Sequence, residues 1–121
     1  MSTPFAAAAL HAYRALQVVH GVNITYERPS ATQSVALSKV VTGRSDHEIT
    51  QDGMVIEQVK SRDYLVRVAD LILGGSQTLP RKGDRIQESG KTYAVLTTGT
   101  EAQWKYTDPS QVIIRIHTRE M

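Results

Sequence analysis

The chain has no cysteine, so its fold does not depend on a disulfide or on an oxidising compartment. It also lacks any apolar run of about 20 residues, and the short apolar stretch at residues 5–10 follows no positively charged region. We therefore expect neither a membrane span nor a signal peptide. The formal charge is only +2, which is too small to imply a polyanionic partner by itself.

The residues that are present have the composition of an ordinary globular domain. Of the 121 residues, 40% are hydrophobic and 21% are charged, which argues against disorder, a collagen-like chain and a coiled coil. A chain of this length removes roughly two thirds of its unfolded surface from water on folding, so it can fold without a structural metal. We expect a single domain over residues 1–121.

The first segment predicts an α-helix over residues 3–20. Thr3 and Pro4 make a favourable helix start, because the Thr3 hydroxyl can accept from an unpaired backbone N–H and proline loses no bond at the first helical position. Apolar residues then recur at steps of three and four, which places them on one face of a helix. His20 and Gly21 provide the helix end.

After the helix the hydrophobic period changes to two. Val22, Ile24 and Tyr26 alternate with polar residues, which predicts a half-buried strand. Residues 34–42 form a second β-rich segment. Residues 43–53 are framed by glycines and contain a single large apolar residue, so we expect them to form a long mobile loop.

The remainder of the chain predicts further strands. Residues 54–59 and 64–71 indicate two strands or one long bent strand, and residues 82–95 indicate two strands joined by a tight Ser-Gly turn. We expect a loop over residues 99–109. A final strand follows, in which Val112, Ile114 and Ile116 alternate with Ile113, Arg115 and His117.

One helix followed by about six to seven strands predicts a mainly β fold of the α+β class. We expect a small β-barrel or rolled antiparallel sheet over residues 22–118, with one N-terminal α-helix packed on its face or across its open end. The connections between the predicted strands are short, which is typical of such folds.

The best candidate for catalysis or metal binding is the triplet Asp46-His47-Glu48. Neighbouring side chains in an extended loop point in divergent directions, and no other segment repeats a metal-ligand spacing, so a hydrated charged loop is the better interpretation. No serine lies in a nucleophile elbow, and no phosphate-binding glycine motif is present. We expect no enzymatic activity, no metal and no cofactor.

A second functional hypothesis is a single-stranded nucleic-acid-binding barrel of the oligonucleotide-binding type. Arg81 and Lys82 form a short basic cluster, and Trp104 and Tyr106 lie in a later segment. Stacking aromatics beside basic groups on a small barrel are what a single-strand binder uses. The same residues also fit an ordinary solvated turn, and we expect no sequence-specific nucleic-acid recognition.

The order of the elements resembles that of phage head-tail joining proteins of the lambda type, which are also called head completion or stopper proteins. The resemblance covers most of the chain. Its most specific part is a basic-Gly-Asp triplet, a strand, a turn glycine and an aromatic-x-Val strand. The matching segments are residues 21–25 (GVNIT), 64–67 (YLVR), 79–86 (LPRKGDRI) and 90–95 (GKTYAV).

This resemblance implies a non-enzymatic virion component. Such a protein docks on the portal or connector of the filled head, presents a surface to tail terminator or tube proteins, and forms a cyclic ring in the particle. It implies a location at the head-tail interface of the virion, and in the bacterial host cytoplasm during assembly. The family's long flexible loop corresponds by position to residues 42–54.

The polar segment also has a physical reason to bind partners. Charges of both signs cannot build a core, but they can form complementary contacts once a partner orders the segment. The second faces of the strands offer another surface, as a ring of identical subunits requires. The expected partner-binding residues are Arg44, Ser45, Asp46, His47, Glu48, Gln51, Asp52, Arg67, Arg115 and His117.

Overall fold

The computed structural model describes the backbone of residues 4–51 and 53–121, and all side chains in these ranges except those of residues 4–6, 16–20, 47–51 and 55–59. One helix, α1 (Pro4–His20), precedes the strands. No helix in the described ranges is long and apolar enough to cross a membrane. The main strands are β1 (Gly21–Arg28), β2 (Gln33–Gln51), β3 (Met54–Arg67), β6 (Arg85–Glu88), β7 (Lys91–Val95), β10 (Trp104–Tyr106) and β11 (Ile113–Glu120).

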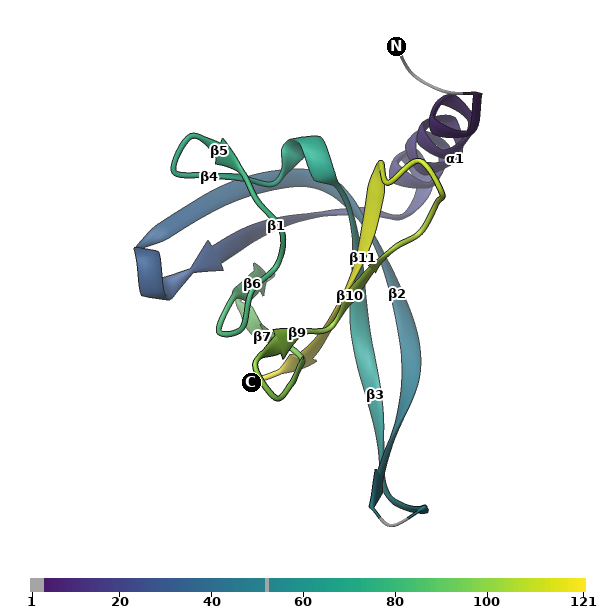
Figure 1. Cartoon of the computed structure of the whole chain (residues 1–121). Coiled ribbons are helices and arrows are strands. Elements are labelled where there is room, and N and C mark those ends of the chain that lie inside the picture. The colour runs from purple at the N-terminus through teal and green to yellow at the C-terminus, as the bar shows by residue number, and fades with distance from the viewer. Residues whose placement is uncertain (1–3, 52) are drawn as a thin grey trace.

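These strands form a closed antiparallel barrel (Figure 1). The sheet order is β10-β11-β3-β2-β1-β6-β7, and an additional pairing of β11 with β7 closes the barrel around six strands, with β10 as an extra strand. One edge of β11 is shared, because Ile114–Ile116 face β10 while Thr118–Glu120 face β7. The predicted mainly β fold with one N-terminal helix is confirmed.

Shorter elements lie between the barrel strands. Two small hairpins are formed by β4 (Ile72–Leu73) with β5 (Ser76–Gln77) and by β8 (Thr97–Thr98) with β9 (Glu101–Ala102). Two 3-10 turns, η1 (Pro29–Ala31) and η2 (Val68–Asp70), follow β1 and β3.

The core follows from the alternation of side chains along the strands. Ile24 and Tyr26 of β1 are buried, as the period-two pattern predicts. The inward faces of β3 and β11 meet them, so that aliphatic and tyrosine side chains fill a barrel too narrow for a lumen. The buried core consists of Ile24, Tyr26, Leu37, Val40, Tyr64, Val66, Leu71, Leu73, Ile86, Val95, Ile114 and Ile116.

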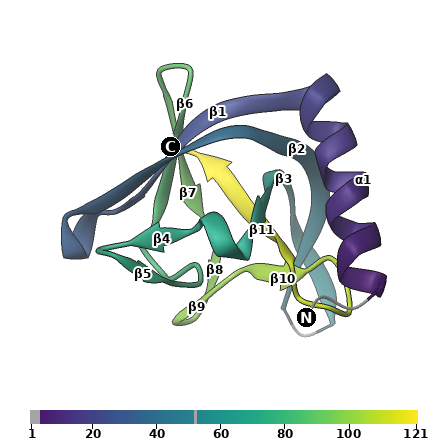
Figure 2. The ribbon, with the colours of Figure 1, turned by 90° about the horizontal axis from the view of Figure 1, so that it is seen from above.

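The helix packs on the outside of the barrel (Figure 2). Among the helix side chains that the structure describes, Tyr13 is buried: it is 4% exposed and packs with Val41 and Ile113, and with the partly buried Leu65. The Tyr13 hydroxyl donates a hydrogen bond of 2.8 Å to the Leu65 carbonyl oxygen. The outward face of the sheet therefore has a small apolar core of its own beneath α1.

Residues 43–51 are strand, so the expectation of an irregular loop over residues 43–53 is wrong in its secondary structure. β2 continues to Gln51 and pairs with β3 from Val41 opposite Leu65 to Gln51 opposite Met54. Backbone hydrogen bonds hold such a ladder, and they need no apolar side chains. Asp52 lies outside the described residues, and Gly53 has a φ of 77°, a conformation that glycine adopts readily.

The distal part of this hairpin leaves the barrel (Figure 1). β2 loses its partner β1 after Val41, and β3 loses its partner β11 before Arg62. We call residues 45–61 the arm. Within the described part of the chain, the two strands of the arm pair only with each other.

The second half of the chain agrees with the predictions except in two segments. The strand predicted over residues 64–71 ends at Arg67, where η2 begins. β6 and β7 form the expected hairpin, with Ser89 and Gly90 at φ angles of 50° and 80°, as a two-residue hairpin turn requires. The segment predicted as a loop over residues 99–109 contains β9 and β10 instead. These strands are two and three residues long, too short for hydrophobic alternation to reveal them.

Candidate partner-binding site

A fully buried carboxylate, Asp63, lies where the arm joins the barrel. Asp63 stands opposite Gly43 in β2 and opposite His117 in β11. Its Oδ2 accepts from the Ser45 hydroxyl and from Arg115 Nε, at 2.6 Å for the latter. Its Oδ1 accepts from the Ser61 hydroxyl at 2.5 Å and lies 2.8 Å from His117 Nδ1. Asp63 thus links three strands, and we call these five residues the Asp63 cluster.

The environment of Asp63 keeps it ionised. Burial alone raises the pKa of a carboxyl group, but hydrogen bonds from Ser45, Ser61, Arg115 and His117 outweigh burial and lower the pKa of Asp63 to about 2. A buried charge is costly unless it is paired and fully hydrogen-bonded. The cluster satisfies that requirement, so it fixes β2, β3 and β11 to one another at the base of the arm.

Gly43 provides the space that the cluster needs. A Cβ atom at this position would lie 2.9 Å from Arg115 Nη2, closer than real Cβ contacts allow. The Arg115 guanidinium instead donates to the Arg44 carbonyl oxygen at 3.1 Å while its Nε reaches Asp63. The glycine at the start of the predicted loop is therefore a close-approach residue rather than a loop boundary.

The structure brings some of the expected partner-binding residues together. Ser45, Arg115 and His117 all belong to the Asp63 cluster, so their polar atoms are engaged within the chain. Arg67 lies elsewhere, beside η2. Of the remaining expected residues, Arg44 is exposed just before the arm and Asp46 is exposed within it, whereas the side chains of His47, Glu48 and Gln51, and the whole of Asp52, lie outside the described residues. A binding role for these residues stays a prediction.

The basic-Gly-Asp triplet ends in a second buried carboxylate, Asp84. The Tyr26 hydroxyl donates to it at 2.5 Å, Arg28 donates at 3.0 and 2.9 Å, and the Arg81 backbone N–H donates at 2.8 Å. Burial and the hydrogen bond to Asp84 raise the pKa of Tyr26, so its hydroxyl remains a donor. Asp84 fastens the 78–84 segment to β1, because Arg28 also holds Thr78 and Leu79.

A third polar group occupies the inward face near the arm. Arg62 donates to both carboxylate oxygens of Glu88, at 2.8 and 2.9 Å, in a two-pronged ion pair. The Tyr64 hydroxyl donates to the same carboxylate at 2.6 Å, and the guanidinium lies 5.5 Å from the Tyr64 ring and 5.6 Å from the Tyr93 ring. These contacts tie β3 to β6 and β7.

The sequence pattern missed Asp63 as a site residue and recognised Asp84 only as part of a motif. The local sequence pattern shows only that Asp63 lies on the same strand face as Leu65 and Arg67. His117 and Arg115 share one face of β11, and only the strand register shows that the two faces coincide.

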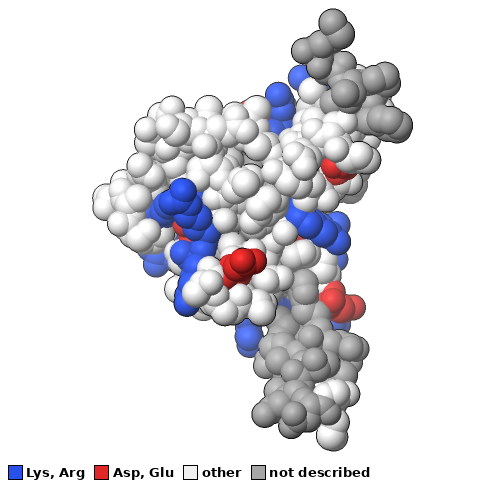
Figure 3. Space-filling model, viewed as in Figure 1, with Lys and Arg blue, Asp and Glu red and all other residues white. Residues whose placement is uncertain are grey.

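The residues of the nucleic-acid hypothesis do lie near one another. Arg81, Lys82 and Trp104 line one surface hollow of about 400 Å³, and Trp104 contacts Tyr106 edge-on at 5.0 Å between ring centroids. Basic side chains gather near β6 beside an acidic one over β9 (Figure 3). For the metal hypothesis, the described side chains contain no metal-binding group of three, and those of His47 and Glu48 lie outside them.

These features define a class of protein: a small antiparallel barrel stabilised by buried carboxylates that are paired and hydrogen-bonded, with a two-stranded arm that extends from it. A model of the phage head-tail joining protein family matches residues 5–121, so the chain belongs to that family. No curated protein matches the chain. The chain is therefore a structural virion protein that joins the phage head to the tail, not an enzyme.

Proposed function

We propose that this protein docks on the portal or connector of the filled head, forms a cyclic ring there, and presents the surface to which the tail terminator or tube proteins attach. The observation that supports this most strongly is the arm, which extends well beyond the barrel while the Asp63 cluster fixes its base (Figure 1). A rigid body with one long projection can contact a neighbouring protein without changing its own core.

The arm has the chemistry of a partner-binding element. Arg44 and Asp46 are exposed at its base, and the backbone groups along both of its outer edges face no other strand in the described part of the chain. Unpaired strand edges accept a strand from a partner, and a two-stranded ribbon alone is only marginally stable. We infer that the free protein is monomeric and that partner contact stabilises the arm.

A shortened arm tests this proposal. Deleting residues 47–58 and closing the hairpin with an Asn-Gly turn leaves Ser45, Ser61 and the whole Asp63 cluster in place. We expect heads lacking this protein to be completed by the wild type and not by the shortened variant, measured as infectious particles after addition of tails. The thermal midpoint of the barrel should change little.

The matched control shortens a different hairpin. Replacing residues 98–101, which are the turn and one residue each of β8 and β9, by a two-residue turn shortens an exposed projection that is not part of the arm. That control should complete heads as the wild type does. If the arm-shortened variant also completes heads normally, the proposal that the arm binds a partner is wrong.

The hollow at Trp104 supports a second candidate function, binding of single-stranded nucleic acid. Arg81 and Lys82 lie on the segment that Asp84 fastens, opposite an indole ring on which a base can stack. We expect any such binding to weaken steeply with salt and to quench the fluorescence of Trp104, the chain's single tryptophan. Titration with an oligothymidine that leaves the fluorescence unchanged would exclude this function.

A further inference from the structure

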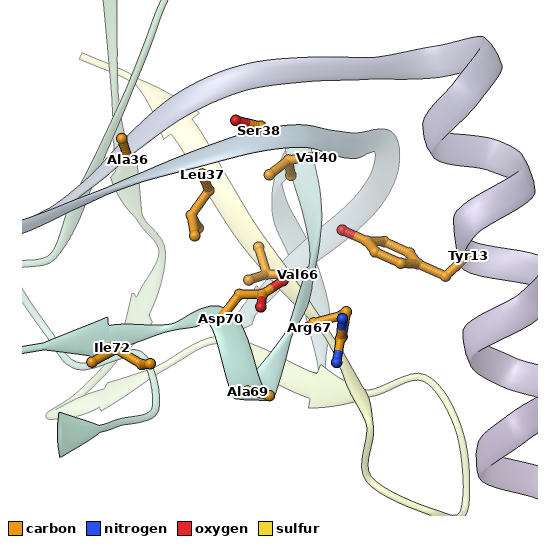
Figure 4. Close-up of a pocket in the computed structure, with 10 residues that line it drawn as sticks. All are labelled: Tyr13, Ala36, Leu37, Ser38, Val40, Val66, Arg67, Ala69, Asp70 and Ile72. Carbon is orange, nitrogen blue, oxygen red and sulfur yellow. The ribbon is translucent and has the colours of Figure 1, made fainter. Parts of the chain in front are cut away.

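The groove between β2 and the β3–η2–β4 segment, which Tyr13 of α1 borders at one end, has an apolar floor and a cation with one donor unpaired among the described residues. It has a volume of about 340 Å³, within the range of binding pockets. Its floor is formed by Leu37, Val40 and Val66, which are 7%, 2% and 1% exposed, and Tyr13 closes the side toward α1 (Figure 4). The side chains of the floor are thus almost completely shielded from water.

The rim of the groove suits an apolar side chain. Ile72 is 45% exposed at the rim, although large aliphatic residues of this chain are mostly buried. Ala36 and Ala69 are exposed and small, so they leave the entrance open. An aliphatic side chain entering here would cover Ile72 and the floor together, which is the usual source of affinity at an interface core.

Arg67 adds a charge requirement. It lines the groove, and its Nε is buried without a hydrogen-bond partner among the described residues. A buried donor without an acceptor is costly, and a carboxylate can satisfy it with two parallel bonds. The exposed Asp70 at the rim disfavours a second carboxylate. The groove therefore fits one carboxylate beside an aliphatic side chain.

The arm carries that combination. Residues 45–61 contain four acidic residues and one basic residue, whereas the rest of the chain contains eight acidic and thirteen basic residues. Acidic and aliphatic residues are adjacent in the arm sequence, at Glu48-Ile49 and again at Ile56-Glu57. The arm is complementary in charge to the body from which it extends, and Arg67 belongs to that body.

The arm of one molecule cannot reach its own groove. It leaves the barrel on the side away from α1 and η2 (Figure 1), and the Asp63 cluster fixes its base. Seven residues of extended strand, 45–51, span about 23 Å, which is enough to reach a neighbouring subunit. A contact between two different surfaces of identical chains is heterologous, and a ring forms when the rotation between successive copies closes.

We propose that the arm of each subunit docks into the α1–β2–η2 groove of the next copy of this chain, with an arm carboxylate on Arg67 and an arm aliphatic side chain over Val66 and Ile72. This inference rests on the proposed ring and names the contact that builds it. A segment of a head or tail protein with the same chemistry is the rival occupant.

The absence of cysteine makes the contact directly testable. Met54, at the end of the arm, is 70% exposed, so a protein carrying both Met54→Cys and Ile72→Cys presents one thiol on each proposed surface. Added to heads that lack this protein and then oxidised, it should give a ladder of covalent multimers. The control pairs Met54→Cys with Met121→Cys, because Met121 is also 70% exposed but lies outside the groove.

We expect the arm–groove pair to yield about tenfold more multimer than the control pair. In the proposed ring the thiols at positions 54 and 72 are in contact at least about ten times more often than those at positions 54 and 121. Arg67→Glu should reduce this yield about tenfold or more. Ala69→Trp, which fills the groove without changing charge, should reduce it too, and it tests the groove if Arg67→Glu fails to fold. Equal multimer yields in the two cysteine pairs, or cross-linking of the thiol at position 54 only to a head or tail protein, would overturn the inference.

The result also separates this inference from the proposed function. If the arm-shortened variant fails to complete heads but the thiols at positions 54 and 72 do not join, the arm binds a different partner and only the arm–groove contact is wrong. If the arm-shortened variant completes heads, the proposed function of the arm is wrong, and the arm–groove contact that rests on it is wrong as well.

Discussion

At the scale of single residues, Asp63 should make stability depend on acid. Its folded pKa of about 2 lies below the usual 3.8, so the unfolded chain binds the proton more readily. The stabilisation is complete above about pH 4 and is lost as the pH falls through the folded pKa near 2. A shift of this size corresponds to about 2 kcal/mol of the free energy of unfolding at neutral pH. Urea denaturation at a series of pH values measures it.

The variant Asp63→Asn should remove this acid-dependent part. It keeps the shape of the side chain but leaves Arg115 without its charged partner, so we expect a loss of about 3 kcal/mol at neutral pH and a flatter profile below pH 4. Asp46→Asn is the matched control, because Asp46 is exposed. If Asp63→Asn keeps the slope of the parent protein, the acid dependence has another origin.

Gly43 and Arg115 should show non-additive effects. Gly43→Ala forces the guanidinium away from the Arg44 carbonyl and from Asp63, so we expect a cost of about 1–2 kcal/mol in the free energy of unfolding. In an Arg115→Met background the clash and the lost bonds disappear together. There Gly43→Ala should be neutral or slightly stabilising, since alanine loses less backbone entropy than glycine. Equal effects of Gly43→Ala in both backgrounds would contradict this account.

At the scale of elements, docking of α1 should depend on the Tyr13 hydroxyl. Tyr13→Phe keeps the ring against Val41 and Ile113 but leaves the Leu65 carbonyl without this donor. We expect a loss of about 1 kcal/mol in the free energy of unfolding, measured by chemical denaturation. Tyr106→Phe serves as the control, because Tyr106 is half-buried against the core and also carries a single hydroxyl. A Tyr13→Phe variant as stable as the parent protein would mean that the helix docks by apolar contact alone.

The elements that the sequence predicts well are those whose side chains alternate between two environments. β1 and residues 64–67 of β3 bury every second residue, as with Tyr64 and Val66 against Leu65 and Arg67. The distal half of β2 lacks that signal, because a two-sided polar ribbon is held by its backbone ladder rather than by burial. A glycine-framed polar segment therefore looks like a loop when it is a strand.

Three members of the Asp63 cluster were named from the sequence as partner-binding residues, and that role stays a prediction. Arg115 and His117 were identified from their shared strand face. The carboxylate that they bind could not be identified, because its partners come from three strands and meet only through the cross-strand register. Ser45 shows the same limit, since its hydroxyl turns toward Asp63 rather than toward solvent. Local patterns assign faces, and register decides which faces coincide.

At the scale of the whole molecule, the separation of charge between arm and body should make assembly sensitive to salt. Four acidic residues lie in the arm and thirteen of the chain's basic residues lie outside it, so neighbouring copies attract when arm meets body. Screening lengths fall from about 10 Å at 0.1 M salt to about 3 Å at 1 M. We expect the rate of head completion to fall by at least about tenfold between these salt concentrations, because steered encounters are the most strongly screened.

A variant with fewer charges in the arm tests whether the salt dependence of head completion comes from arm–body attraction or from contacts with other virion proteins. The double variant Asp46→Asn with Glu57→Gln removes two of the four arm charges and keeps the length and polarity of the hairpin. Its rate of head completion should be lower at 0.1 M salt and should fall less steeply as salt increases. Removing two acidic residues from the body outside the groove, by Glu101→Gln with Glu120→Gln, should leave the steep dependence in place. A slope that is the same for both double variants would mean that the salt effect arises at the head or tail contact, and that arm–body attraction does not guide assembly.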